Sequence, residues 1–359
     1  MADADTAEQV REQANTGTKD VAEPHRFDEA ALHRWMVANV EGYAGPLEVR
    51  QFKGGQSNPT YQLITPGKTY VLRRKPPGKL LPSAHAVDRE YRVISALGPT
   101  GFPVAKTYGL CTDDAVIGTW FYVMDMVEGR ILWDQTLPAS EPAERNAIFR
   151  SKISTLADLH NTDHVKIGLE DYGRPGNYMS RQVDRWTKQY KASETRHIAE
   201  VERLIDWLPR TVPAQERTSI VHGDYRLDNM IFHPTEPRVT AVLDWELGTL
   251  GEPLADFTYV LMNWVNGSIS QLPDMAAHGI PTLRETVDLY CERTGRNGLP
   301  DLNWFFAYNS FRLCGIIQGI VGRVRDGTAN HPQAAQQEER VGLLATASWA
   351  YAQKAGAVA

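Results

Sequence analysis

The feature that most constrains this 359-residue chain is a polar loop between two short apolar runs. The runs cover residues 219–222 and 230–233, and their residue types favour strands. A third β-rich run ends at Asp244, while the loop itself carries Asp224 and Asn229. Asp and Asn are ordinary turn residues, so any one of the three taken alone also fits a plain polar turn. The three in this order indicate a platform for metal and phosphate.

The spacing of these three side chains matches a phosphoryl-transfer site. Asn229 follows Asp224 by five residues, and Asp244 follows Asn229 by fifteen. In kinases, a loop Asp accepts the proton of the acceptor hydroxyl, an Asn five residues later holds one Mg²⁺, and a later Asp also binds metal. Carboxylate and amide oxygens are hard ligands that suit Mg²⁺. We therefore predict Asp224 as the catalytic residue, and Asn229 and Asp244 as metal ligands.

The motif His222-Gly223-Asp224, with Asn229 after it, resembles the signature of the aminoglycoside phosphotransferase-like kinases. In that family His-Gly-Asp replaces the His-Arg-Asp of protein kinases. The likeness covers residues 28–345. Three segments resemble in particular the kinase domain of acyl-CoA dehydrogenase family members 10 and 11 and of bacterial stand-alone relatives; they are residues 54–61, 70–78 and 243–251.

The resemblance implies an α+β, protein-kinase-like fold of two lobes. We expect a small N-lobe with an antiparallel sheet over residues 27–128, and a mostly helical C-lobe over residues 129–359. Residues 1–26 are poor in aromatics and rich in small and polar residues, which predicts a disordered tail. The resemblance also implies ATP and Mg²⁺ as cofactors, and transfer of the γ-phosphoryl group to an alcohol hydroxyl.

The N-lobe begins with strands predicted for residues 47–52 and 60–64, joined by a turn-rich segment. In the kinase interpretation this hairpin lies over the ATP phosphates. Gly55 would permit close approach of the backbone, and Ser57 and Asn58 would offer hydrogen bonds. Without the downstream motif, a plain hairpin loop would be the better explanation of the segment.

The next predicted strand, residues 69–73, ends where a kinase carries its phosphate-binding lysine. Strand alternation favours Arg73 or Lys75 on the inner face and Arg74 on the opposite face. The resemblance selects Arg73, which keeps the positive charge but changes its geometry. Glu90, on a helix predicted over residues 85–97, is its expected ion-pair partner; the alternative is a solvated helix residue.

Residues 102–106 and 120–127 are predicted to complete the sheet. Asp125 and Val127 fall in the segment that resembles the hinge, whose backbone would bind adenine. Beyond it, helices are predicted over residues 148–160, 181–208 and 304–325, with a last helix between 329 and 359.

Two further residues bear on the loop. His160 either orients it or is a hydrogen-bonded core histidine. The resemblance implies that Asp256 binds the backbone of the loop, whereas the residues alone would also allow a helix cap.

Composition excludes several classes of protein. The net charge of −6 argues against a nucleic-acid binder. The three cysteines lack paired spacing, so neither a disulfide framework nor a zinc site is predicted. The first 23 residues have no apolar core, which argues against a secretory signal, and the most apolar helical run is too short to span a membrane. We expect a cytoplasmic protein.

The acceptor is the open part of the prediction. The branch resemblance implies a hydroxyacyl-CoA, whose phosphates would match the cations of residues 73–79 and of Arg312, Arg323 and Arg325. The alternatives are an aminoglycoside- or choline-type acceptor, and a non-catalytic nucleotide-binding scaffold. A polycationic acceptor would need an acidic site.

Overall fold

The computed structural model describes residues 14–54, 58–78, 85–327 and 334–358, and it divides into two compact units. Unit 1 falls within residues 1–155, 164–172 and 226–248. Unit 2 falls within residues 156–163, 173–225 and 249–359. The units therefore alternate along the chain, and the boundary between Tyr225 and Arg226 falls within the loop that carries Asp224 and Asn229. The predicted lobe limit after residue 128 stays a prediction.

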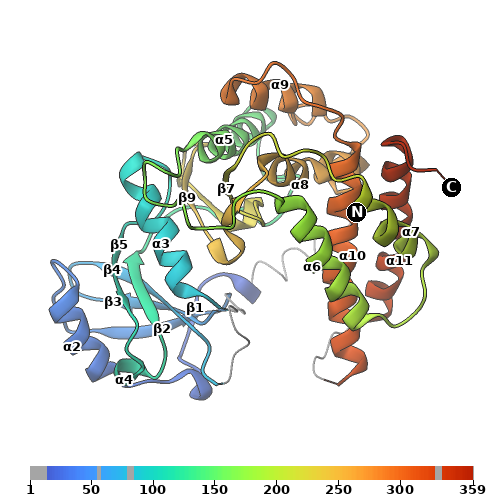
Figure 1. The fold of residues 1–359 in the computed structure, drawn as a ribbon. Coiled ribbons are helices and arrows are strands. Elements are labelled where there is room, and N and C mark those ends of the chain that lie inside the picture. Colours follow the sequence, from blue (N-terminus) through green and yellow to red (C-terminus); the bar gives the residue numbers. More distant parts are fainter. Residues whose placement is uncertain (1–13, 55–57, 79–84, 328–333, 359) are drawn as a thin grey trace. The chain divides into compact units, whose positions relative to one another are not determined.

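Unit 1 is built on a six-stranded antiparallel sheet, drawn in blue to cyan in Figure 1, with the strand order β1-β2-β3-β4-β6-β5. Its strands are β1 Thr18–Lys19, β2 Glu48–Phe52, β3 Thr60–Ile64, β4 Thr69–Arg74, β5 Thr107–Cys111 and β6 Phe121–Asp125. A separate hairpin pairs β8 Met230–Phe232 with β9 Val239–Val242. The helices of unit 1 are α2 Glu29–Asn39, α3 Val87–Leu97, α4 Asp114–Ile117 and the first part of α5 Pro142–Asn161. Unit 1 also contains the short 3-10 turns η1 Glu23–His25, η2 Gly98–Thr100, η3 Leu227–Asn229 and η4 Trp245–Leu247.

Alternation along the strands separates the two faces of the sheet. One face packs on α2 through apolar side chains that include Leu32, Met36 and Leu63. Asp28 caps α2 by accepting a hydrogen bond from the Ala31 amide at 2.9 Å. The other face carries Arg73 and meets α3. Arg73 and the apolar core packed on α2 thus lie on opposite sides of the sheet.

Unit 2 is mostly helical. Its helices are the end of α5, α6 Tyr178–Ser193, α7 Ala199–Arg210, α8 Pro253–Val265, η5 Ile269–Gln271, α9 Leu283–Thr294, α10 Asn303–Arg325 and α11 Ala334–Lys354. A short ladder pairs β7 Ser219–Val221 with β10 Thr249–Gly251. The long helix α10 is buried along most of its length and lies beside α6 and α11 (Figure 1). The helices predicted over residues 148–160 and 304–325 and near the C-terminus are confirmed.

Residues 102–106 do not form the predicted strand; the fifth strand is β5, residues 107–111. Pro103 has no N–H to donate to a ladder. Its carbonyl instead accepts the Val242 amide at 2.8 Å, and the Lys106 carbonyl accepts the Asp125 amide at 2.8 Å. The segment is therefore held by contacts to the β8–β9 hairpin and to β6.

The single helix predicted over residues 181–208 is also wrong, because the chain breaks between α6 and α7. The apolar periodicity continues on both sides of the break, so the sequence pattern does not reveal it. Gln318 of α10 binds the end of α6. Its side-chain amide donates to the Ser193 carbonyl at 2.7 Å and to the Thr195 hydroxyl at 3.1 Å. A tertiary contact thus satisfies a carbonyl that the helix would otherwise have used.

Part of the segment expected as a tail is ordered. Residues 18–19 form β1 at the edge of the sheet, and the His25 carbonyl accepts hydrogen bonds from Tyr61 at 3.0 Å and from Arg74 at 3.2 Å. These partners lie more than thirty residues away in the sequence, which is why composition alone does not predict the order. Residues 1–13 lie outside the described part of the chain. Within that part, no helix combines the length and the apolar character needed to cross a membrane.

Candidate active site

In unit 1, Arg73 lies between two carboxylates. Its Nε is 2.7 Å from Glu90 Oε2, and a terminal nitrogen donates to Asp244 Oδ1 at 2.6 Å. The Arg73 side chain is 11% exposed and that of Glu90 1%, whereas that of Asp244 is 32% exposed. The predicted partnership of Arg73 with Glu90 is therefore present. Solvent reaches the network mainly at Asp244.

The charges in this network are strongly coupled. Burial opposes the charge of Arg73, but the nearby Glu90, Tyr122 and Asp244 raise the pKa of the guanidinium overall. Burial also raises the pKa of Glu90, and the adjacent guanidinium opposes that shift. Arg73 remains charged, and it is the group that favours ionisation of Glu90.

Two more side chains hold Glu90 in place. The Asn58 amide donates to Glu90 Oε1 at 2.8 Å, and the Tyr122 hydroxyl donates to Oε2 at 3.2 Å. Asn58 is fully buried, and its own carbonyl oxygen lies 3.0 Å from His85 Nδ1. We predict Asn58 as a nucleotide-binding residue, and the structure gives it in addition a supporting contact to Glu90. Gly55 and Ser57 lie outside the described residues.

The β8–β9 hairpin places Asn229 and Asp244 at the same end. Met230 pairs with Val242, and the Leu243 amide donates to the Asn229 carbonyl at 2.8 Å. Asp244 has left-handed backbone angles, φ 61° and ψ 64°. Such angles cost energy in a non-glycine residue and are found preferentially at functional sites. An amide oxygen and a partly exposed carboxylate at one hairpin end fit the hard-ligand preference of Mg²⁺.

In the predicted adenine-binding segment, Asp125 and Val127 differ in their hydrogen bonds. The Asp125 amide is used within unit 1, and the Asp125 carboxylate accepts from Tyr108 at 2.6 Å and pairs with Lys68 at 2.7 Å. The backbone N–H and carbonyl of Val127 make no hydrogen bond to another described residue. An adenine base needs such an open donor and acceptor pair, and Val127 fits that need.

In unit 2, Asp256 holds the loop that carries Asp224. Its carboxylate accepts the His222 amide at 2.5 Å and the Gly223 amide at 2.8 Å, which confirms the contact that the resemblance implies. The next amide, that of Asp224, donates to His222 Nδ1 at 3.2 Å. Gly223 has φ +83°, a conformation that L side chains rarely adopt. Within the His-Gly-Asp sequence, the glycine thus permits the positive φ of the loop, and the histidine side chain accepts the amide of the aspartate.

His160 supports Asp256 from below the loop. Its Nδ1 lies 2.7 Å from the Tyr290 hydroxyl, and its Nε2 lies 3.6 Å from Asp256 Oδ2. Burial lowers the pKa of His160, although Asp256 opposes the shift. Burial opposes ionisation of Asp256 too, but His160, His222 and the loop amides lower its pKa overall. His160 is therefore a buried histidine that is hydrogen-bonded through Nδ1 and whose Nε2 lies near the carboxylate that binds the loop amides.

The sequence analysis did not predict the contact of Tyr259 with Asp224, and it did not place Arg312 beside the loop. The Tyr259 hydroxyl donates to Asp224 Oδ1 at 3.0 Å, and Arg312 donates to the Gly223 carbonyl. Tyr259 lies three residues after Asp256, hence on the same side of a helix, which is the signal that would have found it. Arg312 is on an apolar helix, and its position gave no such signal.

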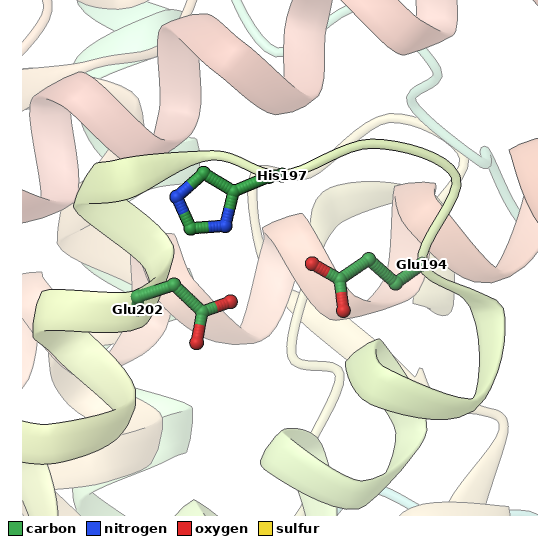
Figure 2. A group of neighbouring side chains, drawn as sticks. All are labelled: Glu194, His197 and Glu202. Atoms are coloured by element: carbon green, nitrogen blue, oxygen red, sulfur yellow. The ribbon is translucent and has the colours of Figure 1, made fainter.

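A second group of ionisable side chains lies on the turn between α6 and α7. Figure 2 shows the His197 ring near the carboxylates of Glu194 and Glu202, and the candidate ligand atoms all lie within 4.8 Å of one another. Lys191 already supplies a cation there, since its Nζ pairs with Glu194 at 3.1 Å and also with Glu202. We therefore assign this group to helix-turn stability and not to metal binding.

Comparison with known sequences and structures identifies the family. The sequence pattern of the phosphotransferase enzyme family matches residues 48–290. The chain belongs to this family. A solved structure from Ralstonia eutropha, provisionally described as an aminoglycoside phosphotransferase, is 53% identical to this phosphotransferase, with a TM-score of 0.85 over 92% of this chain and 99% of that one. The predicted transfer of a phosphoryl group to a hydroxyl is thereby confirmed at the level of the enzyme class.

The curated relatives are longer proteins. Acyl-CoA dehydrogenase family member 10 of Mus musculus is 41% identical over 94% of this phosphotransferase, and member 11 of Gallus gallus is 44% identical over 88%. The chain spans only 32% and 42% of their respective lengths. The predicted resemblance to this branch is confirmed.

More distant structures show the fold alone. The spectinomycin phosphotransferase, solved with ADP and spectinomycin, is 11% identical, with a TM-score of 0.59 over 92% of this phosphotransferase and all of that chain. It supports the predicted kinase-like fold, with an antiparallel sheet followed by a mostly helical remainder. The convergence of Asp224 with Asn229 and Asp244 stays a prediction, because these residues belong to different units.

Proposed function

We propose that this phosphotransferase uses ATP and Mg²⁺ to phosphorylate an alcohol hydroxyl of a hydroxyacyl-CoA. The observation that carries the proposal is the buried ion pair of Arg73 with Glu90, joined to Asp244. A guanidinium fixed on a strand and linked to a partly exposed carboxylate suits the recognition of nucleotide phosphates.

Each side chain of unit 1 then has a distinct role. Arg73 neutralises the nucleotide phosphates, and Glu90 fixes its position. The backbone of Val127 binds adenine. Asn229 and Asp244 would hold Mg²⁺, which when bound offsets the negative charge of the phosphates. Gly55 and Ser57, with Asn58, are assigned to the phosphate-covering hairpin.

In unit 2, Asp224 is proposed as the group that aligns and deprotonates the acceptor. The acceptor hydroxyl gives its proton to the Asp224 carboxylate while its oxygen forms a bond to the γ-phosphorus. The bond from that phosphorus to the β,γ-bridging oxygen breaks, and ADP leaves. His222 and Asp256 contribute by fixing the backbone of the loop, so the base needs little reorganisation during transfer.

Fewer of the cations that the sequence offers for the phosphates of CoA are available for that role in the structure. Arg73 is used by Glu90 and Asp244, while Arg74 lies buried on the opposite face of the sheet. Arg325 pairs with Asp326 at 2.7 Å. Arg312 remains as a buried cation beside the loop of Asp224, and a cation there disfavours a polycationic acceptor. The acyl-CoA part of the proposal draws its main support from the names of the curated relatives.

The experiment is an ADP-release assay with an acceptor panel. Purified protein receives ATP and Mg²⁺ with 4-hydroxyacyl-CoA, the free hydroxy acid, kanamycin, choline or homoserine. We expect turnover with the CoA ester. Asp224→Asn should reduce the rate by about 10²–10⁴-fold, the range for loss of a general base. Asp244→Ala should abolish the Mg²⁺-dependent turnover.

The controls separate these assignments. Asp184→Asn makes the same chemical change on the exposed surface of α6 and should leave the rate unchanged. Activity confined to kanamycin or choline would reject the acyl-CoA acceptor but keep the phosphotransferase. Rates near wild type for Asp224→Asn or for Asp244→Ala would reject the assigned base or the assigned metal ligand, respectively.

A further inference from the structure

Tyr259 on α8 touches the side chain that we propose as the base. Its hydroxyl donates to Asp224 Oδ1 at 3.0 Å. Asp256, three residues earlier on the same helix, binds the backbone amides of His222 and Gly223. One helix face therefore fixes both the backbone of the loop and the carboxylate that the loop presents.

Arg312 on α10 supports this arrangement from a second helix. Its guanidinium carbon lies 4.8 Å from the centroid of the Tyr259 ring, and a terminal nitrogen donates to the Gly223 carbonyl. The residue is only 7% exposed and forms no ion pair with a carboxylate among the described residues. A cation placed over an aromatic ring is attracted to it, and more strongly when both are shielded from water. Arg312 thus restrains Tyr259 and the loop together.

We propose that Tyr259 is a positioning residue, which holds the Asp224 carboxylate in one orientation for phosphoryl transfer, with Arg312 holding Tyr259. The proposal rests on the proposed role of Asp224 as the base. A carboxylate rotates readily about its Cβ–Cγ bond, and a donor fixed to one oxygen restricts that rotation. Correct orientation of a reacting group accounts for a large part of enzymatic rate enhancement.

The test compares Tyr259→Phe with Tyr190→Phe in the ADP-release assay, using whichever acceptor the wild-type protein turns over. Tyr190 is a fully buried tyrosine of α6 whose hydroxyl has no hydrogen-bond partner among the described residues. It therefore provides the same chemical change away from Asp224. Thermal midpoints of all variants show whether each one is folded.

We expect Tyr259→Phe to lower kcat by about 10- to 100-fold, the range for losing a hydrogen bond to a charged group, with KM for ATP within about twofold of wild type. Tyr190→Phe should retain wild-type kcat. In an Asp224→Asn background, Tyr259→Phe should cause no further loss, because its effect passes through the Asp224 carboxylate. A general structural defect would act equally in both backgrounds.

Three results would overturn the inference in distinguishable ways. A kcat near wild type for Tyr259→Phe, while Asp224→Asn is inactive, would reject the positioning role and keep the proposed function. An equal loss from Tyr259→Phe in both backgrounds would assign Tyr259 a role that is independent of Asp224. A kcat near wild type for Asp224→Asn would reject the proposed base itself.

Discussion

Replacing Arg73 with Met should make the stability of the protein depend strongly on pH. The substitution keeps most of the side-chain volume but removes the cation that lies 2.7 Å from Glu90. Glu90 is 1% exposed, so its carboxylate would be left in an apolar setting without a counter-charge. Removing one partner of a buried ion pair costs about 3–5 kcal/mol. Asn58 and Tyr122 still donate to Glu90, which places the expected loss near the lower end, about 3 kcal/mol at pH 8.5.

The sign of the pH dependence follows from Glu90. Burial already raises its pKa, and Arg73 opposes that shift, so removing Arg73 raises the pKa further. An acid whose pKa is higher in the folded state than in the unfolded state contributes stability at low pH, which is lost as the pH rises through the folded pKa. Each unit of that difference amounts to about 1.4 kcal/mol. The loss relative to wild type should therefore be smaller at pH 5 than at pH 8.5.

The measurement is urea unfolding of wild type and Arg73→Met, without nucleotide, at pH 5, 7 and 8.5. The double variant Arg73→Met/Glu90→Gln is the control, because glutamine does not titrate and the extra pH dependence should disappear. If Arg73→Met is destabilised by the same amount at pH 5 and pH 8.5, within about 0.5 kcal/mol, the assignment of that cost to an ionised Glu90 is wrong.

Two further predictions concern unit 1. Lys152 is fully buried, and burial lowers its pKa to about 8. Between pH 8 and 10.5 the unfolded chain binds a proton that the folded chain does not, so the stability of wild type relative to Lys152→Met should increase as the pH rises through that window. Urea unfolding measures this difference, and an equal dependence of stability on pH for the two proteins would contradict the prediction. At Gly129, an added Cβ would collide with the Phe232 carbonyl and the Ile231 side chain, so Gly129→Ala should lower stability by about 1–3 kcal/mol in thermal melts. Gly67→Ala, where a Cβ meets nothing within 4 Å, is the matched control, and equal melting points for the two variants would refute the steric argument.

Local periodicity predicted most of the sheet correctly. Alternation places Arg73 and Arg74 on opposite faces of β4, and the structure confirms it: Arg73 meets Glu90, whereas Arg74 lies under the Phe27 ring at 5.1 Å. The choice between Arg73 and Lys75 could not be made from alternation alone. In the structure, Arg73 is the residue that pairs with Glu90, and Lys75 lies over the Trp120 ring at 3.8 Å.

Features fixed by distant partners escaped prediction. The end of α6 depends on Gln318, which lies 125 residues after Ser193. The same limit applies to the site, since the restraint of the Asp224 loop by Arg312 spans 89 residues. Spacing within one motif or one helix is readable from a sequence, whereas a contact between separate helices has no local pattern. Such contacts explain both the wrong helix boundary and the missed contact of Arg312 with the loop.

Two buried carboxylates of the site show why sequence position alone does not determine charge. Glu90 and Asp256 are both acidic residues in the first turn of a helix, α3 and α8 respectively. Burial raises the pKa of Glu90, and the Arg73 guanidinium and the Tyr122 hydroxyl oppose the shift without reversing it. Asp256 is equally buried, but two loop amides and His160 reverse the effect of burial and lower its pKa. Asp256 therefore holds the loop as an anion, whereas Arg73 is the cation that favours the charged form of Glu90. Arg73 is therefore the position where a single substitution should leave a buried carboxylic acid whose pKa lies still further above its ordinary value.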